Sequence, residues 1–102
     1  MLNHTPNVCI DYDIVEGNIQ RALDRISPYG LKHRPHIKAH KSVELAKLQI
    51  AKGCSGITCA KLGEAEVMAN AGINDILLAY PLIGEEKLDR YAALIQKGVQ
   101  MK

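Results

Sequence analysis

The chain has 102 residues, of which 47% are hydrophobic and 24% are charged. These are ordinary proportions for one small globular domain, so they argue against a mostly disordered chain. The formal net charge is +2, with 13 basic residues scattered among 11 acidic ones, and this excludes the basic stripe of a nucleic-acid-binding surface.

The N-terminus lacks the basic and apolar regions of a signal peptide, and the longest apolar run, 76–80, is far too short to span a membrane. The three cysteines are an odd number without paired spacing, which predicts reduced thiols rather than a disulfide framework. We therefore expect a cytoplasmic protein with no membrane partner.

The first expected unit is a short β-prone run, 8–10, followed by a helix that ends near residue 26. Asp13 is the expected N-cap because Glu16 follows three residues later, as in a capping box. The sequence SPYG at 27–30 predicts the end of the helix. The apolar side chains of this helix recur at helical spacing, at Val15, Ile19, Ala22, Leu23 and Ile26.

The next extended stretch is 34–39, where Pro35 favours an extended conformation for Arg34. Ser42 is expected to cap a second helix that ends at Gly53 and buries a stripe formed by Leu45, Leu48 and Ala51. Strand and helix then alternate: strand 56–60, helix 64–71, strand 75–80, helix 85–97 and the opening of a strand at 99–101. In the last helix we expect the inward side chains to be Leu88, Ala92 and Ile95. A glycine follows each expected helix, at 30, 53, 72 and 98, as is typical of C-caps.

The strands recur about every 20 residues as apolar runs, which is typical of a parallel sheet covered by helices. This alternation fits either a βα barrel or a doubly wound sheet. No strand is followed by GxGxxG or GxxxxGK[ST], and this absence favours the barrel. A full barrel has eight βα units in about 250 residues. We therefore expect an α/β fold that comprises the first three to four βα units of a (βα)8 TIM barrel, incomplete within 1–102; the alternative is a complete small α/β domain.

Four polar side chains share one face of the 34–39 stretch, because side chains alternate along a strand. They are Arg34, His36, Lys38 and His40, whereas Pro35, Ile37 and Ala39 face the other way. Such side chains are costly to bury without partners, so they indicate an active site at the C-terminal end of a barrel strand. Desolvation and cationic neighbours favour a neutral lysine amine, which is a nucleophile and forms Schiff bases. The cofactor that most often uses such a lysine is pyridoxal 5'-phosphate (PLP).

Several other residues are weaker candidates for the active site or for metal binding. Lys41 is the rival nucleophile, but it has the opposite parity to Lys38 and is expected in a loop. His36 and His40 are not expected to bind a metal, because that spacing makes a ligand pair on a helix rather than on a strand. Cys59 is expected to pack under a helix, and Tyr80 is a candidate for lining the same barrel mouth as Lys38.

The octapeptide RPHIKAHK at 34–41 resembles the RPHxK[TA]HK signature of the D-threonine aldolase and D-serine dehydratase family. The resemblance extends over nearly the whole chain: it includes Thr5-Pro6 with Asp11 and Asp13, the segments 56–60 and 63–66, and 75–81. Members of this family are PLP enzymes with an alanine-racemase-like (fold type III) barrel. The resemblance therefore implies that 1–102 is the N-terminal part of an alanine-racemase-like PLP-binding barrel domain, without the C-terminal β-domain.

The resemblance implies a PLP-dependent lyase that acts on D-β-hydroxy-amino acids, as an aldolase or a dehydratase, with Lys38 forming the Schiff base. His36 and His40 are expected to orient this lysine or to contact the cofactor. A divalent metal, most of the phosphate site and a second subunit of a homodimer are implied for the parent, with the metal ligands outside this chain. For 1–102 alone we expect no activity. A non-catalytic PLP-binding protein with the same barrel fold is the alternative.

Overall fold

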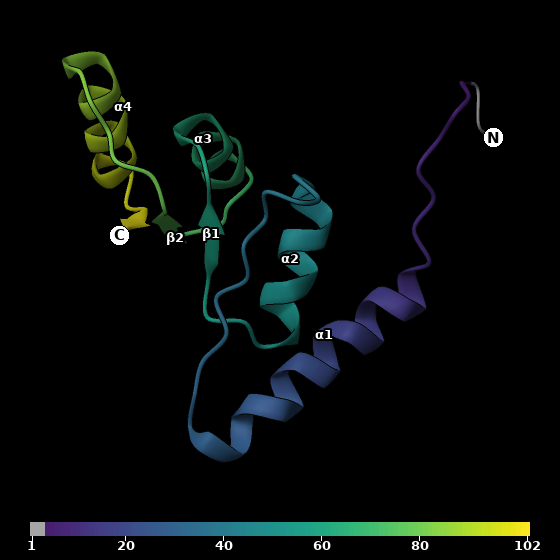
Figure 1. Cartoon of the computed structure of the whole chain (residues 1–102). Coiled ribbons are helices and arrows are strands. Elements are labelled where there is room, and N and C mark those ends of the chain that lie inside the picture. The colour runs from purple at the N-terminus through teal and green to yellow at the C-terminus, as the bar shows by residue number, and fades with distance from the viewer. Residues whose placement is uncertain (1–3) are drawn as a thin grey trace.

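The computed structural model describes residues 4–102, which form a short parallel sheet with helices between the strands (Figure 1). The elements in chain order are α1 (Tyr12–Ile26), the 3-10 helix η1 (Ser27–Tyr29), α2 (Val43–Lys52), β1 (Ile57–Cys59), α3 (Leu62–Asn70), β2 (Asp75–Leu78), α4 (Glu85–Gln96) and β3 (Gln100–Met101). The alternation of strand and helix from residue 56 onward was therefore predicted correctly.

The three strands lie in the order β1-β2-β3 and are parallel, with Ile57 opposite Ile76 and Asp75 opposite Gln100. The segment before α2 joins the free edge of β1 through a single parallel bridge between His36 and Thr58. The extended stretch expected at 34–39 thus lies beside β1 as far as Ile37: the Thr58 amide donates to the Pro35 carbonyl and the Ile37 amide donates to the Thr58 carbonyl. It ends there because the chain turns at 38–40.

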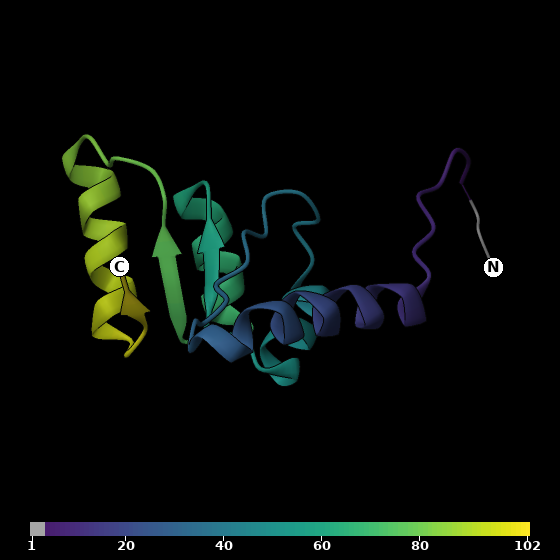
Figure 2. The same cartoon turned by 60° about the horizontal axis from the view of Figure 1, so that its bottom comes forward.

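The helices α2, α3 and α4 lie on one face of the sheet, and no helix of residues 4–102 covers the other face (Figures 1 and 2). In β2 the side chains of Ile76 and Leu78 are buried under the helices, whereas Asp75 and Leu77 are only half-buried. This is the alternation of a strand with one helix-covered face. The arrangement is that of a partial βα barrel, as predicted.

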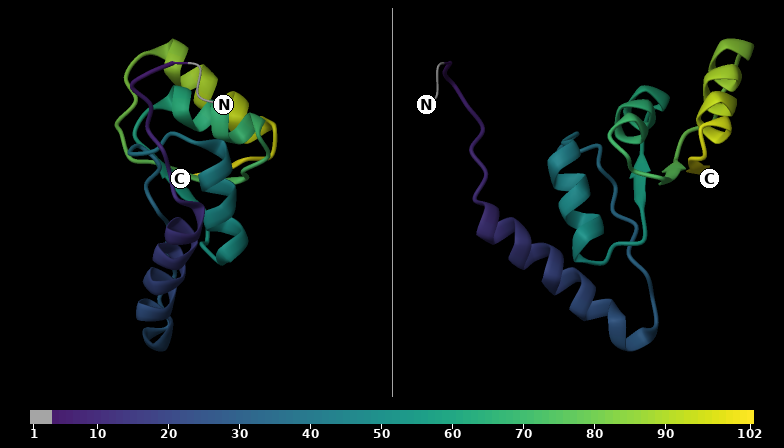
Figure 3. Two further views of the ribbon diagram at one scale, coloured as in Figure 1. Left: turned by 90° about the vertical axis from the view of Figure 1, so that its right-hand side faces the viewer. Right: turned by 180° about the vertical axis from the view of Figure 1, so that it is seen from behind.

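Helix α1 extends away from the sheet and contacts η1 and α2 (Figure 3). It begins two residues earlier than expected, because Asp11 rather than Asp13 is its N-cap: Asp11 Oδ1 accepts a hydrogen bond of 3.2 Å from the Ile14 amide. The β-prone run at 8–10 is also not a strand. Val8 is 94% exposed, and no strand of the described chain lies beside it to satisfy its backbone.

The predicted start of α2 and the glycines expected after the helices are confirmed, whereas α3 begins at Leu62, two residues earlier than expected. Ser42 caps α2, and its Oγ accepts a hydrogen bond of 3.2 Å from the Leu45 amide. The glycines after η1, α2, α3 and α4 all have positive φ, between 67° and 124°. Non-glycine residues rarely adopt this conformation, so these glycines end their helices as expected.

Two helices are rotated relative to the predicted orientation. In α2 the side chain against the core is Ala46, supported by Val43 and Ile50, and Ala51 is exposed. In α4 the buried side chain is Leu94, whereas Leu88 and Ile95 are each 51% exposed. The Val99 amide donates a backbone hydrogen bond of 3.1 Å to the Leu94 carbonyl, which closes the turn between α4 and β3.

The cysteines at 9, 54 and 59 are all free thiols, as their odd number predicts. Cys59 is fully buried in the core, and burial, with a smaller contribution from the charge of Glu64, raises its pKa to about 12. It is therefore a packing residue, as predicted, and not a nucleophile. Within residues 4–102, no helix has the length and apolar character needed to cross a membrane.

Candidate functional site

Lys38 lies on a tight turn that begins where the chain leaves the sheet. The preceding residue, Ile37, is fully buried in the core, which contributes about 1.5–3 kcal/mol and fixes the backbone at this point. The turn is closed by a 2.8 Å hydrogen bond from the Lys41 amide to the Ile37 carbonyl. Lys38 is exposed on this turn, which lies beside the C-terminal ends of the parallel strands.

His36 supports the backbone of Lys38. Its Nδ1 accepts a hydrogen bond of 3.2 Å from the Lys38 amide. A ring nitrogen that accepts carries no proton, so the neutral ring of His36 has its proton on Nε2. Through this hydrogen bond the half-buried His36 ring stabilises the conformation of the turn that carries Lys38.

His40 faces helix α2 and does not share a face with Lys38. Its Nδ1 accepts a hydrogen bond of 2.9 Å from the Ser42 amide, and its Nε2 lies 3.2 Å from Gln49 Oε1. Both contacts are satisfied by the tautomer with its proton on Nε2. The predicted alternation stops at Ile37, because the turn at 38–40 redirects the following side chains; Ala39 is likewise exposed and not under a helix.

Lys41, the rival of Lys38, is engaged in an ion pair with Glu64. The other oxygen of Glu64 accepts hydrogen bonds from the amides of Ala60 at 2.8 Å and Lys61 at 3.1 Å. Burial raises the pKa of the Glu64 carboxyl, but the hydrogen bonds from Lys41 and the two amides outweigh it and hold the pKa below its ordinary value. The Lys38 ammonium makes no such ion pair among the described residues, and this distinguishes it from Lys41.

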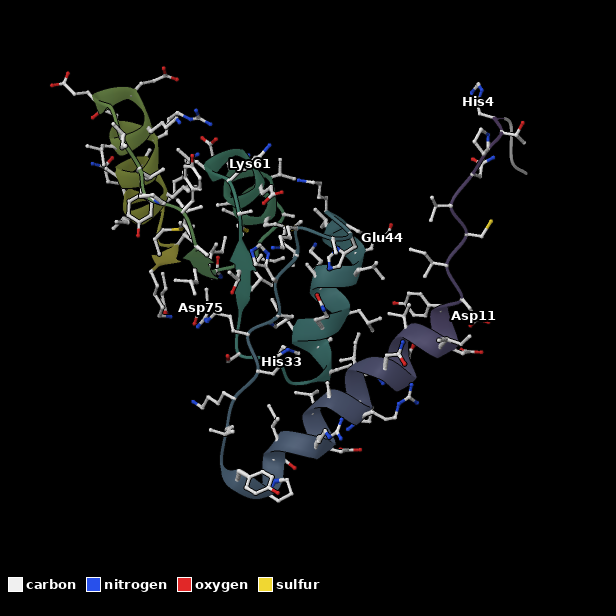
Figure 4. All side chains as sticks on the ribbon, in the orientation of Figure 1. His4, Asp11, His33, Glu44, Lys61 and Asp75 are labelled. Carbon is white, nitrogen blue, oxygen red and sulfur yellow. The ribbon has the colours of Figure 1, made fainter. Side chains whose placement is uncertain are left out.

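Arg34 lies at the opposite end of the sheet from Lys38. Its Nη1 is 2.6 Å from Asp75 Oδ1, and the same oxygen accepts a 2.6 Å hydrogen bond from Lys102 Nζ. Figure 4 shows Asp75 at the lower end of the strands, while Lys61 lies at the upper end, where the strand β1 leads into α3. The four polar side chains of 34–40 therefore do not form one cluster, and the interaction with Asp75 gives Arg34 a structural role.

The Asp75 carboxylate predicts a pH-dependent contribution to stability. The hydrogen bond from Arg34 lowers its pKa; burial opposes this, and Lys102 lowers it further, so that the pKa of folded Asp75 is below its ordinary value. A lowered folded pKa stabilises the protein above about pH 4, and this contribution is lost as pH falls through the folded pKa. Asp75→Asn should therefore lower the free energy of unfolding by about 1–2 kcal/mol at pH 7.

Urea unfolding of the full-length protein at pH 7 and at pH 3 checks this, and the effect of Asp75→Asn should shrink at the lower pH. Asp24→Asn is the matched control, because Asp24 is exposed and accepts a side-chain hydrogen bond only from Gln20, besides its backbone contacts. An equal loss of stability at both pH values would contradict a role for the Asp75 charge.

Tyr80 and Lys38 lie in different environments. Tyr80 is 58% exposed and lines a cavity of about 460 Å³ together with Ala60, Lys61, Leu82 and Arg90. Lys38 does not line this cavity. A shared mouth for Tyr80 and Lys38 therefore stays a prediction. Residues 4–102 contain no group of three or more His, Cys, Asp or Glu side chains that could hold a metal ion.

Comparison with known proteins identifies the family. The model of the alanine racemase N-terminal domain matches residues 10–100. The chain belongs to this family. Over 95 residues it is 41% identical to the 3-hydroxy-D-aspartate aldolase of Paracoccus denitrificans, covering 92% of this chain and 24% of that protein. It is 40% identical to the D-threo-3-hydroxyaspartate dehydratase of Delftia sp. (strain HT23), covering 96% of this chain and 26% of that protein.

Solved structures agree with this assignment. The crystal structure of D-threonine aldolase from Filomicrobium marinum superposes with a TM-score of 0.91 at 37% identity, over 96% of this chain and 26% of that one. The alanine-racemase-like family resemblance and the partial barrel predicted from the sequence are thus confirmed. The chain spans about a quarter of the length of the relatives it matches.

Proposed function

We propose that the protein carrying this chain is a PLP-dependent lyase that acts on D-β-hydroxy-amino acids, and that Lys38 holds the cofactor. The similar proteins support the reaction class, since their names include aldolases and dehydratases of hydroxyaspartate, D-threonine and D-serine. The observation that carries the proposal is the exposed amine of Lys38, which makes no ion pair among residues 4–102, on a hydrogen-bonded turn at the end of the parallel strands. Ligands of barrel enzymes bind at this edge.

The side chains of this turn fit PLP. An aldehyde cofactor requires a primary amine that is free to react, and Lys38 supplies it, whereas Lys41 is engaged with Glu64. His36 presents an Nε2–H that is free to donate, because its Nδ1 already accepts from the Lys38 amide. The donor set of the turn therefore suits an anionic cofactor that is bound covalently.

The roles of the residues follow from these contacts. When bound, PLP would supply a ring that takes up the electron pair left at Cα of the substrate, from the Cα–Cβ bond in an aldolase or from the Cα–H bond in a dehydratase, where the β-hydroxyl group then leaves as water. Lys38 Nζ holds the cofactor, and once it is released it is an amine that can take up or return a proton. His36 and His40 orient the turn through their Nδ1 atoms, which accept hydrogen bonds from backbone amides. Both ring nitrogens of His40 are occupied, so for this residue the orienting role is favoured over direct contact with the cofactor.

The proposed activity is tested on the full-length protein with PLP and with the D- and L-forms of threonine, serine and 3-hydroxyaspartate. We expect turnover of D-substrates only. Release of glycine and an aldehyde identifies an aldolase, whereas release of ammonia and a keto acid identifies a dehydratase. Binding of PLP without turnover of any of these substrates would contradict the lyase and favour the non-catalytic PLP-binding protein.

A further inference from the structure

The turn that carries Lys38 is tied to the start of α3 by a single carboxylate. Lys41 Nζ donates to Glu64, which lies 23 residues further along the chain. The side chain of Glu64 is only 10% exposed, and its second oxygen accepts from the backbone amides of Ala60 and Lys61. The Glu64 carboxylate therefore joins the turn, the end of β1 and the first turn of α3.

The turn needs such support because of its backbone conformation. Lys41 has a φ of 51°, the only positive value among the non-glycine residues that the structure describes. A non-glycine residue in this region costs about 1–3 kcal/mol and persists only where the surroundings hold it. The amide of Lys41 is held by Ile37 and its side chain by Glu64, so both ends of this residue are fixed.

We propose that Lys41 and Glu64 are positioning residues for Lys38. Their ion pair holds the turn in its left-handed conformation before the cofactor binds, so that the amine of Lys38 is already placed at the edge of the sheet. Neither residue is required to touch the cofactor. This inference rests on the proposed function for the identity of the bound group, but the ordering of the turn is a property of the protein without PLP. Order that exists before binding increases affinity, since less conformational freedom is lost.

Glu64→Gln in the full-length protein tests this inference. Glutamine keeps an oxygen that can accept from the amides of Ala60 and Lys61, but it removes the charge that holds Lys41. We expect the Kd for PLP to rise about tenfold, which is the usual size of one lost coupling between neighbouring groups. In the PLP-free protein, amide hydrogen exchange over 37–43 should become faster by a similar factor.

The matched control is Glu66→Gln on the same helix. It removes the same charge and breaks the ion pair with Arg90, which joins α3 to α4 and does not reach the turn. We expect it to leave both the Kd for PLP and the exchange over 37–43 at the wild-type values. Equal effects of Glu64→Gln and Glu66→Gln would show a general loss of charge or stability and would overturn the inference.

Lys41→Met provides a second variant, on an exposed side chain that is not needed for folding of the core. It should reproduce the effects of Glu64→Gln, and the double variant should be no worse than either single one, because both remove the same interaction. Additive effects, or unchanged exchange in either variant, would overturn the inference. Failure of the proposed function is seen in the wild-type protein, which would then bind no PLP or bind it without turnover, while amide exchange at 37–43 in the variants still reports the effect of the ion pair.

Discussion

Replacement of Lys38 by alanine in the full-length protein is expected to abolish covalent attachment of PLP and to lower lyase turnover by about 10²–10⁴-fold or more. The physical reason is that the Lys38 amine is exposed and has no ion-pair partner within the described part of the chain, whereas the neighbouring Lys41 ammonium is engaged with Glu64. The absorbance of protein-bound PLP after removal of free cofactor measures attachment, and product release measures turnover.

Two lysine variants control for this result. Lys32→Ala removes an exposed lysine that precedes the bridged segment and should leave attachment and turnover unchanged. Lys41→Ala should keep covalent attachment, with weaker PLP binding, because it disturbs only the position of the turn. Normal attachment of PLP in Lys38→Ala, or loss of attachment in Lys41→Ala alone, would show that Lys38 is not the reactive amine.

Replacement of Gly56 by alanine is expected to lower the free energy of unfolding by about 2–4 kcal/mol. This is the largest effect on stability that we predict for any single substitution. Gly56 lies where Arg34 crosses to reach Asp75. An alanine Cβ at this position would lie 2.7 Å from the Asp75 carbonyl oxygen and would also collide with the Arg34 guanidinium. Backbone atoms of a buried strand cannot move aside cheaply, so the sheet or the ion pair must be displaced.

Gly63→Ala is the matched control, because no atom lies within 4 Å of the added Cβ and the residue is in the first turn of α3. This variant should be neutral or up to about 1 kcal/mol more stable, since alanine favours a helix over glycine. Urea unfolding of the full-length protein compares the two variants. A Gly56→Ala variant as stable as Gly63→Ala would contradict the close approach of Arg34 to this glycine.

The elements of the fold were predictable from the sequence because their signals are local. Ser42 marks the start of α2, and glycines mark the ends of four elements in the order expected for alternating helix and strand. The rotation of α4 was not predictable, because Leu88, Ala92 and Ile95 have helical spacing, and so have Tyr91 and Leu94, which pack against the core instead. Which of the two stripes faces the sheet depends on packing against segments that are distant in sequence.

The assignment of Lys38 as the reactive lysine stays a prediction, and the structure differs from the surroundings that were expected for it. The parity of a strand placed Arg34, His36, Lys38 and His40 on one face, and this holds only while the chain stays extended. The extended conformation ends at Ile37, and the turn that follows closes at Lys41 with a positive φ that no glycine signals in the sequence. Lys38 is also exposed in residues 4–102, and not enclosed by cationic neighbours as the parity argument expected.

Partners that are distant in sequence were also missed. Asp75 lies 41 residues from Arg34, and Glu64 lies 23 residues from Lys41. Glu64 lies three residues after Lys61, the N-cap of α3, and accepts from the Lys61 amide as in a capping box. Its second contact, with Lys41, depends on the parallel arrangement of two segments, which a single sequence does not give.

Lys38 can be tested directly as the attachment point of the cofactor. Borohydride reduction of the full-length protein with PLP fixes the cofactor to its lysine, and mass spectrometry of the tryptic peptides then locates the label. A labelled Lys38 resists trypsin and Arg34 is followed by proline, so we expect the phosphopyridoxyl mass on the peptide 33–41. A label on Lys41, which would give the peptide 39–47, or on any lysine outside this segment would contradict the assignment.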